Sequence, residues 1–251
     1  MPLSASPPVR INLWSGPRNV STALMYSFSR RSDTRVVDEP LYGHYLRGSD
    51  APHPGKHEVI AAMDTDGERV IRNVILGPCD RPVLFMKQMA HHLVDVPRDF
   101  LAATHNVLLI RDPQQMLPSL AQNLESPTLR DTSLALQTEL FAHLKAIGQD
   151  PPVLDAKQLL TDPRSVLSQL CERLGLAFEE SMLSWPAGPI PEDGVWAKHW
   201  YQAVHTTTGF LPYENKTEPF PPRLKPLLDE CRPHYARLAQ HAIQAQPQTG
   251  T

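Results

Sequence analysis

The sequence predicts an α/β fold in which helices cover both faces of a parallel sheet. Short apolar runs of strand length alternate along the chain with segments of helical periodicity. The apolar runs are nearly continuous, as is typical of strands that are buried on both faces. Hydrophobic residues make up 41% of the 251 positions, which is enough to form the core of a single domain.

Strands are predicted where a short apolar run ends at a turn-forming or polar residue. The first run, Ile11 to Trp14, passes into a tight loop, and Pro40 ends the second run. The predicted strands are 11–14, 34–38, 83–86, 106–110 and 152–154. Residues 41–56 are rich in Gly, His and Pro, and we expect them to form a loop.

Helices are predicted from apolar residues at helical spacing and from residues that are typical of helix ends. Asp162 followed by Pro163 is typical of a helix start, and Gly175 is typical of a helix end. The predicted helices cover 23–30, 68–76, 114–123, 133–147, 163–174 and 223–245. Most of them lie between predicted strands, as the crossovers of a parallel sheet must.

The composition argues against several classes of protein. A net charge of −3 without a long basic stripe argues against a nucleic-acid partner. No apolar run approaches the roughly 20 residues that a membrane helix needs, and Met1 to Arg10 lacks the apolar region of a signal peptide. Cys79, Cys171 and Cys231 lack metal-ligand spacing and favour a reducing compartment. We therefore expect a cytoplasmic protein with no membrane partner and no bound metal.

Polar residues follow four of the predicted strands. Because the carboxyl ends of parallel strands meet at one edge of a sheet, where ligands bind, we expect these side chains to converge. They are Ser15 to Ser21, Asp38 and Glu39, Lys87, and Arg111 and Asp112.

The loop after the first strand predicts a phosphate-binding site. It ends in Ser21 and Thr22, which open a helix, and the first amides of a helix have no internal acceptor. Arg18 adds a positive charge within the loop. Gly16 is present, but the second glycine and the lysine of a Walker A motif are missing. A structural turn capped by Ser21 is therefore an equally good interpretation of the loop alone.

A second pair of residues favours a phosphorylated ligand. Arg111 ends a strand, and Ser119 lies eight residues further, about two turns into the next helix. A guanidinium group offers a planar fork of donors that suits a phosphate group. The alternative is a surface ion pair between Arg111 and Asp112. Two anion-binding devices at adjacent strand ends make the ligand hypothesis the stronger one.

Together these motifs resemble those of the sulfotransferase superfamily that uses 3′-phosphoadenosine 5′-phosphosulfate (PAPS). A Pro-Lys-Ser-Gly-Thr-Thr-type loop holds the 5′-phosphosulfate in that family, and Pro17 to Thr22 are similar to it, with Arg18 in place of Lys and Val20 in place of Gly. An Arg and a Ser eight residues apart hold the 3′-phosphate, and Arg111 and Ser119 match them.

A third segment also resembles the family. Val153 to Pro163 and then Leu170 to Leu176 are similar to its strand, its Asp-Pro loop and its helix that ends in Leu-Gly-Leu. The resemblance implies a P-loop-type parallel sheet with a nucleotide-binding core over 9–185. A Pro- and aromatic-rich loop and a C-terminal helix would follow over 186–251. It implies PAPS as co-substrate and a small-molecule acceptor with a hydroxyl or amine.

The resemblance also assigns roles to single residues. The 5′-phosphosulfate would be held by Arg18, Asn19, Val20, Ser21 and Thr22, and the 3′-phosphate by Arg111 and Ser119. With Val20 replacing a Gly, the loop has less freedom for a positive φ at that position. The late Arg-Lys-Gly segment of the family, which also touches the 3′-phosphate, has no clear counterpart. Lys198 and Lys216 are the nearest basic candidates.

A general base must take the proton of the acceptor as sulfur is attacked. Cytosolic sulfotransferases are similar at the strand that ends in Lys87, but their base is a His where this chain has Met89. The resemblance therefore assigns the base to Glu39. Asp38, His91 and His92 are its alternatives. Lys87 would stabilise charge on the transferring group.

The acceptor pocket is expected to be shaped by residues 41–56 and 186–221. Aromatic residues of 194–213, among them Trp196 and Trp200, would stack on adenine, cover the acceptor or pack in the core. Two other functions stay open. One is a nucleotide kinase or NTPase in which Asp38 and Glu39 hold Mg²⁺. The other is a protein that binds a nucleotide without catalysis.

Overall fold

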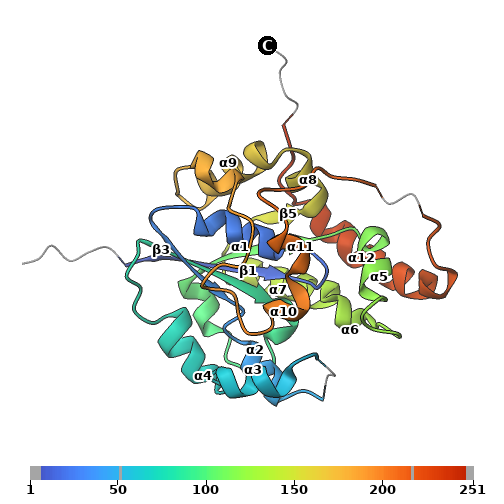
Figure 1. The fold of residues 1–251 in the computed structure, drawn as a ribbon, viewed down its shortest axis with the longest axis horizontal. Coiled ribbons are helices and arrows are strands. Elements are labelled where there is room, and N and C mark those ends of the chain that lie inside the picture. Colours follow the sequence, from blue (N-terminus) through green and yellow to red (C-terminus); the bar gives the residue numbers. More distant parts are fainter. Residues whose placement is uncertain (1–6, 51–52, 216–217, 247–251) are drawn as a thin grey trace, which may run out of the picture.

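The computed structural model describes residues 7–50, 53–215 and 218–246, and its core is a five-stranded parallel sheet (Figure 1). The strands are β1 (Val9–Ser15), β2 (Thr34–Asp38), β3 (Val83–Met89), β4 (His105–Ile110) and β5 (Val153–Asp155). They lie in the order β2-β3-β1-β4-β5, and each neighbouring pair is parallel. The predicted α/β fold is confirmed.

Helices and short helical turns connect these strands. The α-helices are α1 (Ser21–Ser29), α2 (Tyr42–Arg47), α3 (Lys56–Ala62), α4 (Gly67–Val70), α5 (Pro113–Leu120), α6 (Leu129–Thr132), α7 (Leu134–Ala146), α8 (Ala156–Thr161), α9 (Pro163–Arg173), α10 (Ala197–Trp200), α11 (Gln202–His205) and α12 (Lys225–Ala239). A π-helical turn covers Ile71–Ile75, and 3₁₀ turns cover Ala90–His92, Asp99–Ala103, Glu180–Leu183 and Pro222–Leu224. None of the helices in these described ranges is long and apolar enough to cross a bilayer.

Alternate side chains of the central strand β1 belong to two core clusters, one on each face of the sheet. Ile11 and Leu13 are fully buried among residues of α1, α8 and α9. Trp14 is fully buried among residues of the π-helical turn, α7 and α12. Because both faces are covered, β1 carries apolar residues on both faces of the sheet, and its polar residue Asn12 is buried as well.

The loop predicted over 41–56 is wrong in part, because its first half forms α2. Tyr42, Tyr45 and Leu46 lie at helical spacing and are buried, and this packing outweighs the unfavourable composition of the segment. Gly43 allows a close approach: a Cβ at this position would lie 2.7 Å from Cβ of Met63. The glycine that suggested a loop is therefore a packing residue within a helix.

Two helices end earlier than predicted. Helix α5 ends at Leu120 and α12 at Ala239, whereas the sequence predicted helix to 123 and 245. After α12 the chain pairs with the edge strand β5, since the N–H of Ile243 donates to the carbonyl oxygen of Val153 at 2.9 Å. The start of α9 is as predicted: the Asp162 carboxylate accepts a hydrogen bond from the N–H of Ser165.

Candidate functional site

Most of the polar residues that follow the strands line one cavity of about 490 Å³ at the carboxyl edge of the sheet, whereas Ser15, Asp38 and Asp112 do not line it. Every residue that the sequence assigned to binding or catalysis lines it: Arg18, Asn19, Val20, Ser21, Thr22, Glu39, Lys87, Arg111 and Ser119. Residues of both 41–56 and 186–221 also line the cavity, among them Tyr42 and Trp200. The convergence of the strand ends therefore brings together residues that lie up to 101 positions apart.

The loop between β1 and α1 presents free backbone donors to the cavity. Val20 occupies the N-cap position and provides no side-chain acceptor. Within the described chain, the N–H groups of Ser21, Thr22 and Ala23 have no hydrogen-bond acceptor. The interpretation as a turn capped by Ser21 is therefore wrong, since Ser21 is the first residue of the helix. Three unpaired amides at the positive end of a helix form a site for an anion.

The conformation of this loop is held by the side chain of Asn19. Its Nδ2 donates to the carbonyl oxygen of Leu109 at 3.1 Å, and its Oδ1 accepts from the N–H of Val20 at 2.8 Å. The positive φ of the loop falls on Arg18 (φ 54°), whereas Val20 has a φ of −91°. A valine is therefore tolerated at residue 20, because the left-handed conformation is required two residues earlier.

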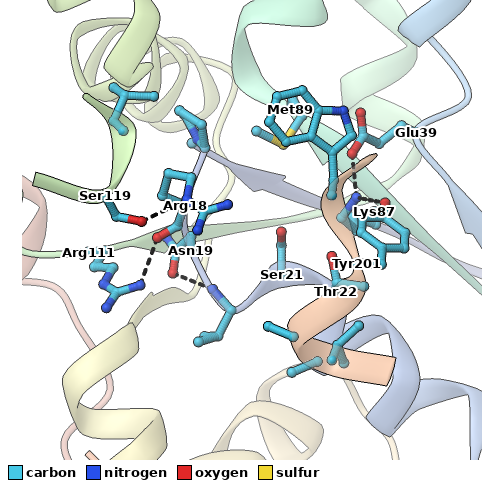
Figure 2. Close-up of a pocket in the computed structure, with 18 of the residues that line it drawn as sticks. Arg18, Asn19, Ser21, Thr22, Glu39, Lys87, Met89, Arg111, Ser119 and Tyr201 are labelled. Atoms are coloured by element: carbon cyan, nitrogen blue, oxygen red, sulfur yellow. Dashed lines mark hydrogen bonds and ion pairs between the residues drawn. The ribbon is translucent and has the colours of Figure 1, made fainter. Parts of the chain in front are cut away.

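On one side of the cavity, two arginines and a serine contact one another (Figure 2). Nε of Arg18 donates to Oγ of Ser119 at 2.8 Å, and Nη1 of Arg111 donates to the carbonyl oxygen of Arg18 at 2.7 Å. Burial and the neighbouring Arg18 lower the pKa of Arg111. A positive charge that is buried beside another one favours the binding of an anion.

The alternative role for Arg111, a surface pair with Asp112, is wrong. The carboxylate of Asp112 caps α5 by accepting a hydrogen bond from the N–H of Gln114 at 2.8 Å. In the part of the chain that the structure describes, neither Arg111 nor Arg18 forms an ion pair with a carboxylate. Both guanidinium groups are thus available to a ligand.

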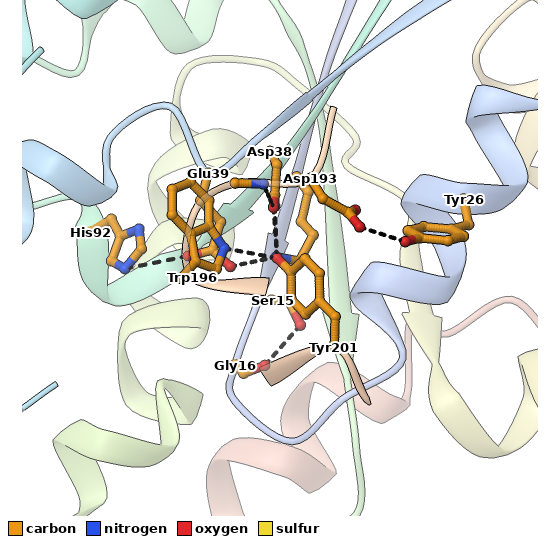
Figure 3. Close-up of polar contacts among 11 residues, drawn as sticks. Ser15, Gly16, Tyr26, Asp38, Glu39, His92, Asp193, Trp196 and Tyr201 are labelled. Atoms are coloured by element: carbon orange, nitrogen blue, oxygen red, sulfur yellow. Dashed lines mark hydrogen bonds and ion pairs between the residues drawn. The ribbon is translucent and has the colours of Figure 1, made fainter. Parts of the chain in front are cut away.

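On the other side of the cavity, Lys87 is buried between the carboxylates of Asp38 and Glu39. Figure 3 shows these two acidic residues beside Tyr201. Its Nζ donates to Oδ1 of Asp38 at 2.9 Å, to Oε1 of Glu39 and to the hydroxyl oxygen of Tyr201 at 2.6 Å. Burial by itself would lower the pKa of Lys87, but the two carboxylates outweigh it and the pKa is raised. All three ammonium hydrogens are committed, so Lys87 acts on a ligand through the groups that it holds.

Asp38 and Glu39 carry one more negative charge than Lys87 neutralises. Burial raises the pKa of Glu39; Lys87 opposes this change and Asp38 adds to it. Glu39 also has a positive φ of 41°, which is uncommon for a residue other than glycine and is typical of functional sites. A carboxylate with raised proton affinity at the wall of a cavity is suited to accept a proton from a ligand.

The same carboxylates bear on the kinase hypothesis. The Lys87 ammonium lies against both Asp38 and Glu39, so the pair already has a cation. The described residues contain no group of three or more His, Cys, Asp or Glu side chains arranged to hold a metal ion. This arrangement provides no support for the assignment of Asp38 and Glu39 as magnesium ligands.

Tyr201 is a member of this network that the sequence did not predict. Its hydroxyl accepts hydrogen bonds from Nε1 of Trp196 at 3.0 Å and from Lys87, and it donates to Oδ2 of Asp38 at 2.7 Å. The aromatic content of 194–213 drew attention to the segment, but for stacking on adenine, for covering the acceptor or for packing in the core. The Tyr201 hydroxyl bonds to a carboxylate that is distant in sequence, so no local sequence pattern predicts this contact.

The segment that carries Tyr201 is held to α1 by Asp193 and to β2 by Gly194. Oδ2 of Asp193 accepts from the hydroxyl of Tyr26 in α1 at 2.7 Å and lies 2.9 Å from Nε2 of His205. The next residue, Gly194, donates its N–H to Oδ2 of Asp38 at 3.2 Å. Residues from Trp196 to Leu211 therefore form a wall of the cavity that is tied to α1 and β2.

The wall near Glu39 consists of aromatic rings. The imidazole of His92 lies between the rings of Tyr42 and Tyr45, with centroids 4.9 and 4.8 Å away. Its Nε2 is 3.9 Å from Oε2 of Glu39. Burial, together with neighbouring cationic or ionisable groups, lowers the pKa of His92 well below its usual value. His92 is thus a neutral ring in the wall of the cavity. In the neighbouring residue His91, Nδ1 lies 2.8 Å from the hydroxyl oxygen of Ser133.

The sequence offered four candidate ligand contacts in the C-terminal part of the chain: the aromatic residues Trp196 and Trp200 and the basic residues Lys198 and Lys216. Trp196 is buried at 4% exposure, while Trp200 is half-buried, and both line the cavity. Lys198 does not line it, because Nζ of Lys198 pairs with Glu58 at 2.6 Å on the surface. Lys198 is therefore no substitute for the missing basic segment, and Lys216 lies outside the described residues.

Comparison with known proteins places this fold and site in one family. A family model described as a sulfotransferase domain matches residues 9–242. The chain therefore belongs to the sulfotransferase domain family, and its predicted relationship is confirmed.

Solved sulfotransferase structures share the fold. The sulfotransferase domain from the curacin biosynthetic pathway has a TM-score of 0.55 at 17% identity, over 92% of this chain and 98% of that one. The corresponding domain of the Synechococcus PCC 7002 olefin synthase has a TM-score of 0.51 at 17% identity, over 89% and 94% of the two chains. At such low identity the similarity shows the fold alone.

Two curated relatives from Arabidopsis thaliana are much closer in sequence. They are named branched-chain-amino-acid aminotransferase-like protein 2 and protein 1, and they are 37% and 39% identical over 92% and 93% of this chain. The chain spans 41% and 42% of their lengths. The matching part corresponds to the sulfotransferase domain described above.

Proposed function

We propose that the protein transfers a sulfuryl group from PAPS to a hydroxyl or amine of a small-molecule acceptor. One observation carries this proposal: Arg111 with Ser119 and the free amides of Ser21 to Ala23 line the same cavity. A nucleotide with phosphate groups at both its 3′ and 5′ positions needs two separate anion sites of this kind.

The bound donor supplies the sulfuryl group, and the residues of the chain position and deprotonate the acceptor. The amides at the start of α1 would hold the 5′-phosphosulfate, with the hydroxyls of Ser21 and Thr22 nearby. Arg111 and Ser119 would hold the 3′-phosphate. Glu39 would accept the proton of the acceptor as its oxygen or nitrogen bonds to sulfur and the bond between sulfur and the bridging oxygen breaks.

Lys87 and its partners would prepare Glu39 for this step. Lys87 holds Oε1 of Glu39 in place, and its positive charge stabilises the carboxylate form. Asp38 and Tyr201 fix Lys87 in turn. The electrostatic role that the sequence suggested for Lys87 would thus reach the transferring group through Glu39.

The test is isothermal titration of the protein with adenosine 3′,5′-bisphosphate, the product of the donor. We expect binding, and we expect Arg111→Ala to weaken it by about tenfold or more, as the loss of a charge-assisted hydrogen bond does. Arg223→Ala, which removes an exposed arginine outside the cavity, is the matched control. Binding that is the same in the Arg111 variant and the native protein would remove the 3′-phosphate assignment.

Transfer is tested separately with PAPS that carries a labelled sulfur atom. Incubation with a panel of phenols, alcohols and amines should yield a labelled acceptor, and Glu39→Gln should abolish the label while binding persists. Magnesium-dependent ATP turnover without sulfuryl transfer would instead favour a kinase or NTPase. Nucleotide binding with no turnover across the panel would favour a non-catalytic protein.

A further inference from the structure

We infer that the Arg18 side chain recognises the 3′-phosphate of the nucleotide, together with Arg111 and Ser119. This inference rests on the proposed function, because it assigns one group of the proposed ligand to one residue of the same cavity. It differs from the role that the sequence motif suggests, in which Arg18 holds the 5′-phosphosulfate. The two roles predict different binding behaviour.

The Arg18 side chain contacts a residue that is assigned to the 3′-phosphate. Its Nε donates to Oγ of Ser119 at 2.8 Å, so a phosphate group held by that hydroxyl also lies within reach of the Arg18 guanidinium. Figure 2 shows Arg18, Ser119 and Arg111 on one side of the cavity, opposite Glu39 and Lys87. Arg18 thus belongs with the residues assigned to the 3′-phosphate.

The local charge around Arg18 suits a phosphate group. Arg111 donates to the carbonyl oxygen of Arg18, and in the described ranges neither guanidinium group is paired with a carboxylate. Two neighbouring cations without a counter-charge match a dianionic group. A phosphomonoester such as the 3′-phosphate carries about −1.5 to −2 charges at pH 7. The 5′-phosphosulfate spreads its charge over two linked groups and is matched by a row of amides.

The two ends of the cavity differ in the donors that they supply. The start of α1 offers the free backbone N–H groups of Ser21, Thr22 and Ala23. At the other end, the late basic segment of the family has no clear counterpart in the sequence, and Lys198 is held by Glu58. Arg18 reaches Ser119 from the first loop and supplies a positive charge at this end.

The backbone of Arg18 fits this role. Its φ of 54° lies in the left-handed region, and the hydrogen bond from Arg111 to its carbonyl oxygen holds the peptide in place. Arg111 therefore fixes the residue that carries the second charge. The two arginines act as one unit, and the loss of either one should weaken the same ligand group.

The experiment compares two probes, adenosine 3′,5′-bisphosphate and adenosine 5′-monophosphate, by isothermal titration. The native protein should prefer the bisphosphate. Arg18→Gln should weaken the binding of the bisphosphate by about tenfold or more, and it should leave the affinity for the monophosphate within about twofold of the native value. Arg173→Gln, an equal change of charge at an exposed site outside the cavity, should alter neither affinity.

The possible outcomes separate the hypotheses. If Arg18→Gln weakened the binding of both probes equally, the inference would be overturned and Arg18 would be assigned to the 5′ end. Unchanged binding of both probes would also overturn the inference. A native protein without preference for the bisphosphate would reject the proposed function itself. Should Arg18→Gln fail to fold, Arg18→Lys retains the charge without the planar fork, and it should still reduce the preference for the bisphosphate selectively.

Discussion

The hydroxyl of Tyr201 donates a hydrogen bond to Oδ2 of Asp38 at 2.7 Å, and the two residues are 163 positions apart. Asp38 is the last residue of β2, while Tyr201 lies between the short helices α10 and α11. The contact closes the network around Lys87 and links the C-terminal segment to the edge of the sheet. The geometry of Glu39 therefore depends on a segment that is distant in sequence.

We predict that Tyr201→Phe lowers both stability and activity. The substitution leaves Asp38 and Lys87 each without one buried partner, which costs about 1–3 kcal/mol of unfolding free energy. Urea unfolding measures this loss. In transfer assays we expect kcat to fall. The acidic side of the plot of kcat against pH should also shift, because the pKa of Glu39 depends on the same network. Tyr213→Phe is the control, since among the described residues its hydroxyl donates to Asn215 and lies outside this network. An unchanged pH profile would show that Tyr201 is structural only.

We predict that Lys87→Met destabilises the protein strongly. It leaves Asp38 and Glu39 buried without their shared cation, and breaking a buried ion pair costs about 3–5 kcal/mol. Chemical denaturation measures the effect. The exposed pair of Lys145 with Asp150 provides the comparison, where Lys145→Met should cost about 0–1 kcal/mol because water screens the charges. Similar losses in the two variants would contradict the assignment of Lys87 to a buried network.

We predict that Glu39→Gln removes transfer but not nucleotide binding. A positioned general base contributes about 10²–10⁴-fold to a rate, and glutamine retains the size of the side chain without its basicity. In the native protein the activity should fall as pH drops through the raised pKa of Glu39, above the ordinary value of about 4.3. Rate measurements against pH, with titration of adenosine 3′,5′-bisphosphate as control, test this. Activity retained by the variant would transfer the role of base to another residue.

We predict that His92 makes the folded state sensitive to acid. Its pKa in the fold is well below the value of about 6.5 in the unfolded chain, so only the unfolded chain takes up this proton as pH falls below about 6.5. Stability is therefore lost toward acid pH, by at most about 1.4 kcal/mol per pH unit from this one group. Urea unfolding at a series of pH values, compared with His92→Gln, isolates the effect. Equal pH dependence in both proteins would be inconsistent with a neutral buried His92.

Much of the fold was predictable from local sequence patterns. The five strands appear where apolar runs occur, and Asp162 with Pro163 marks the start of α9 as expected. Helix α2 was missed because its glycine and histidine have poor helix propensity, while the burial of Tyr45 and Leu46 is a property of the folded chain. Propensity is local, whereas burial depends on neighbours that are distant in sequence.

The site was predictable to a similar extent. Strand ends in a parallel sheet converge, so Glu39, Lys87 and Arg111 were placed at one cavity by topology alone. The sequence did not reveal the contacts among them, such as the approach of Arg18 to Ser119. Tyr201 and Asp193 were also missed, because each acts through a hydrogen bond to a residue more than a hundred positions away.

The sequence by itself determined the parallel α/β fold, the loop that begins α1 and the set of charged residues at the sheet edge. These follow from periodicity and from residues adjacent in the chain, where geometry is set by short-range sterics and backbone hydrogen bonds. Only the tertiary structure decided which partners the charged side chains contact: Lys87 pairs with Asp38 and Glu39, and Arg18 bonds to Ser119. The pairing depends on distances of a few ångströms between separate elements, and only packing of the whole chain sets such distances.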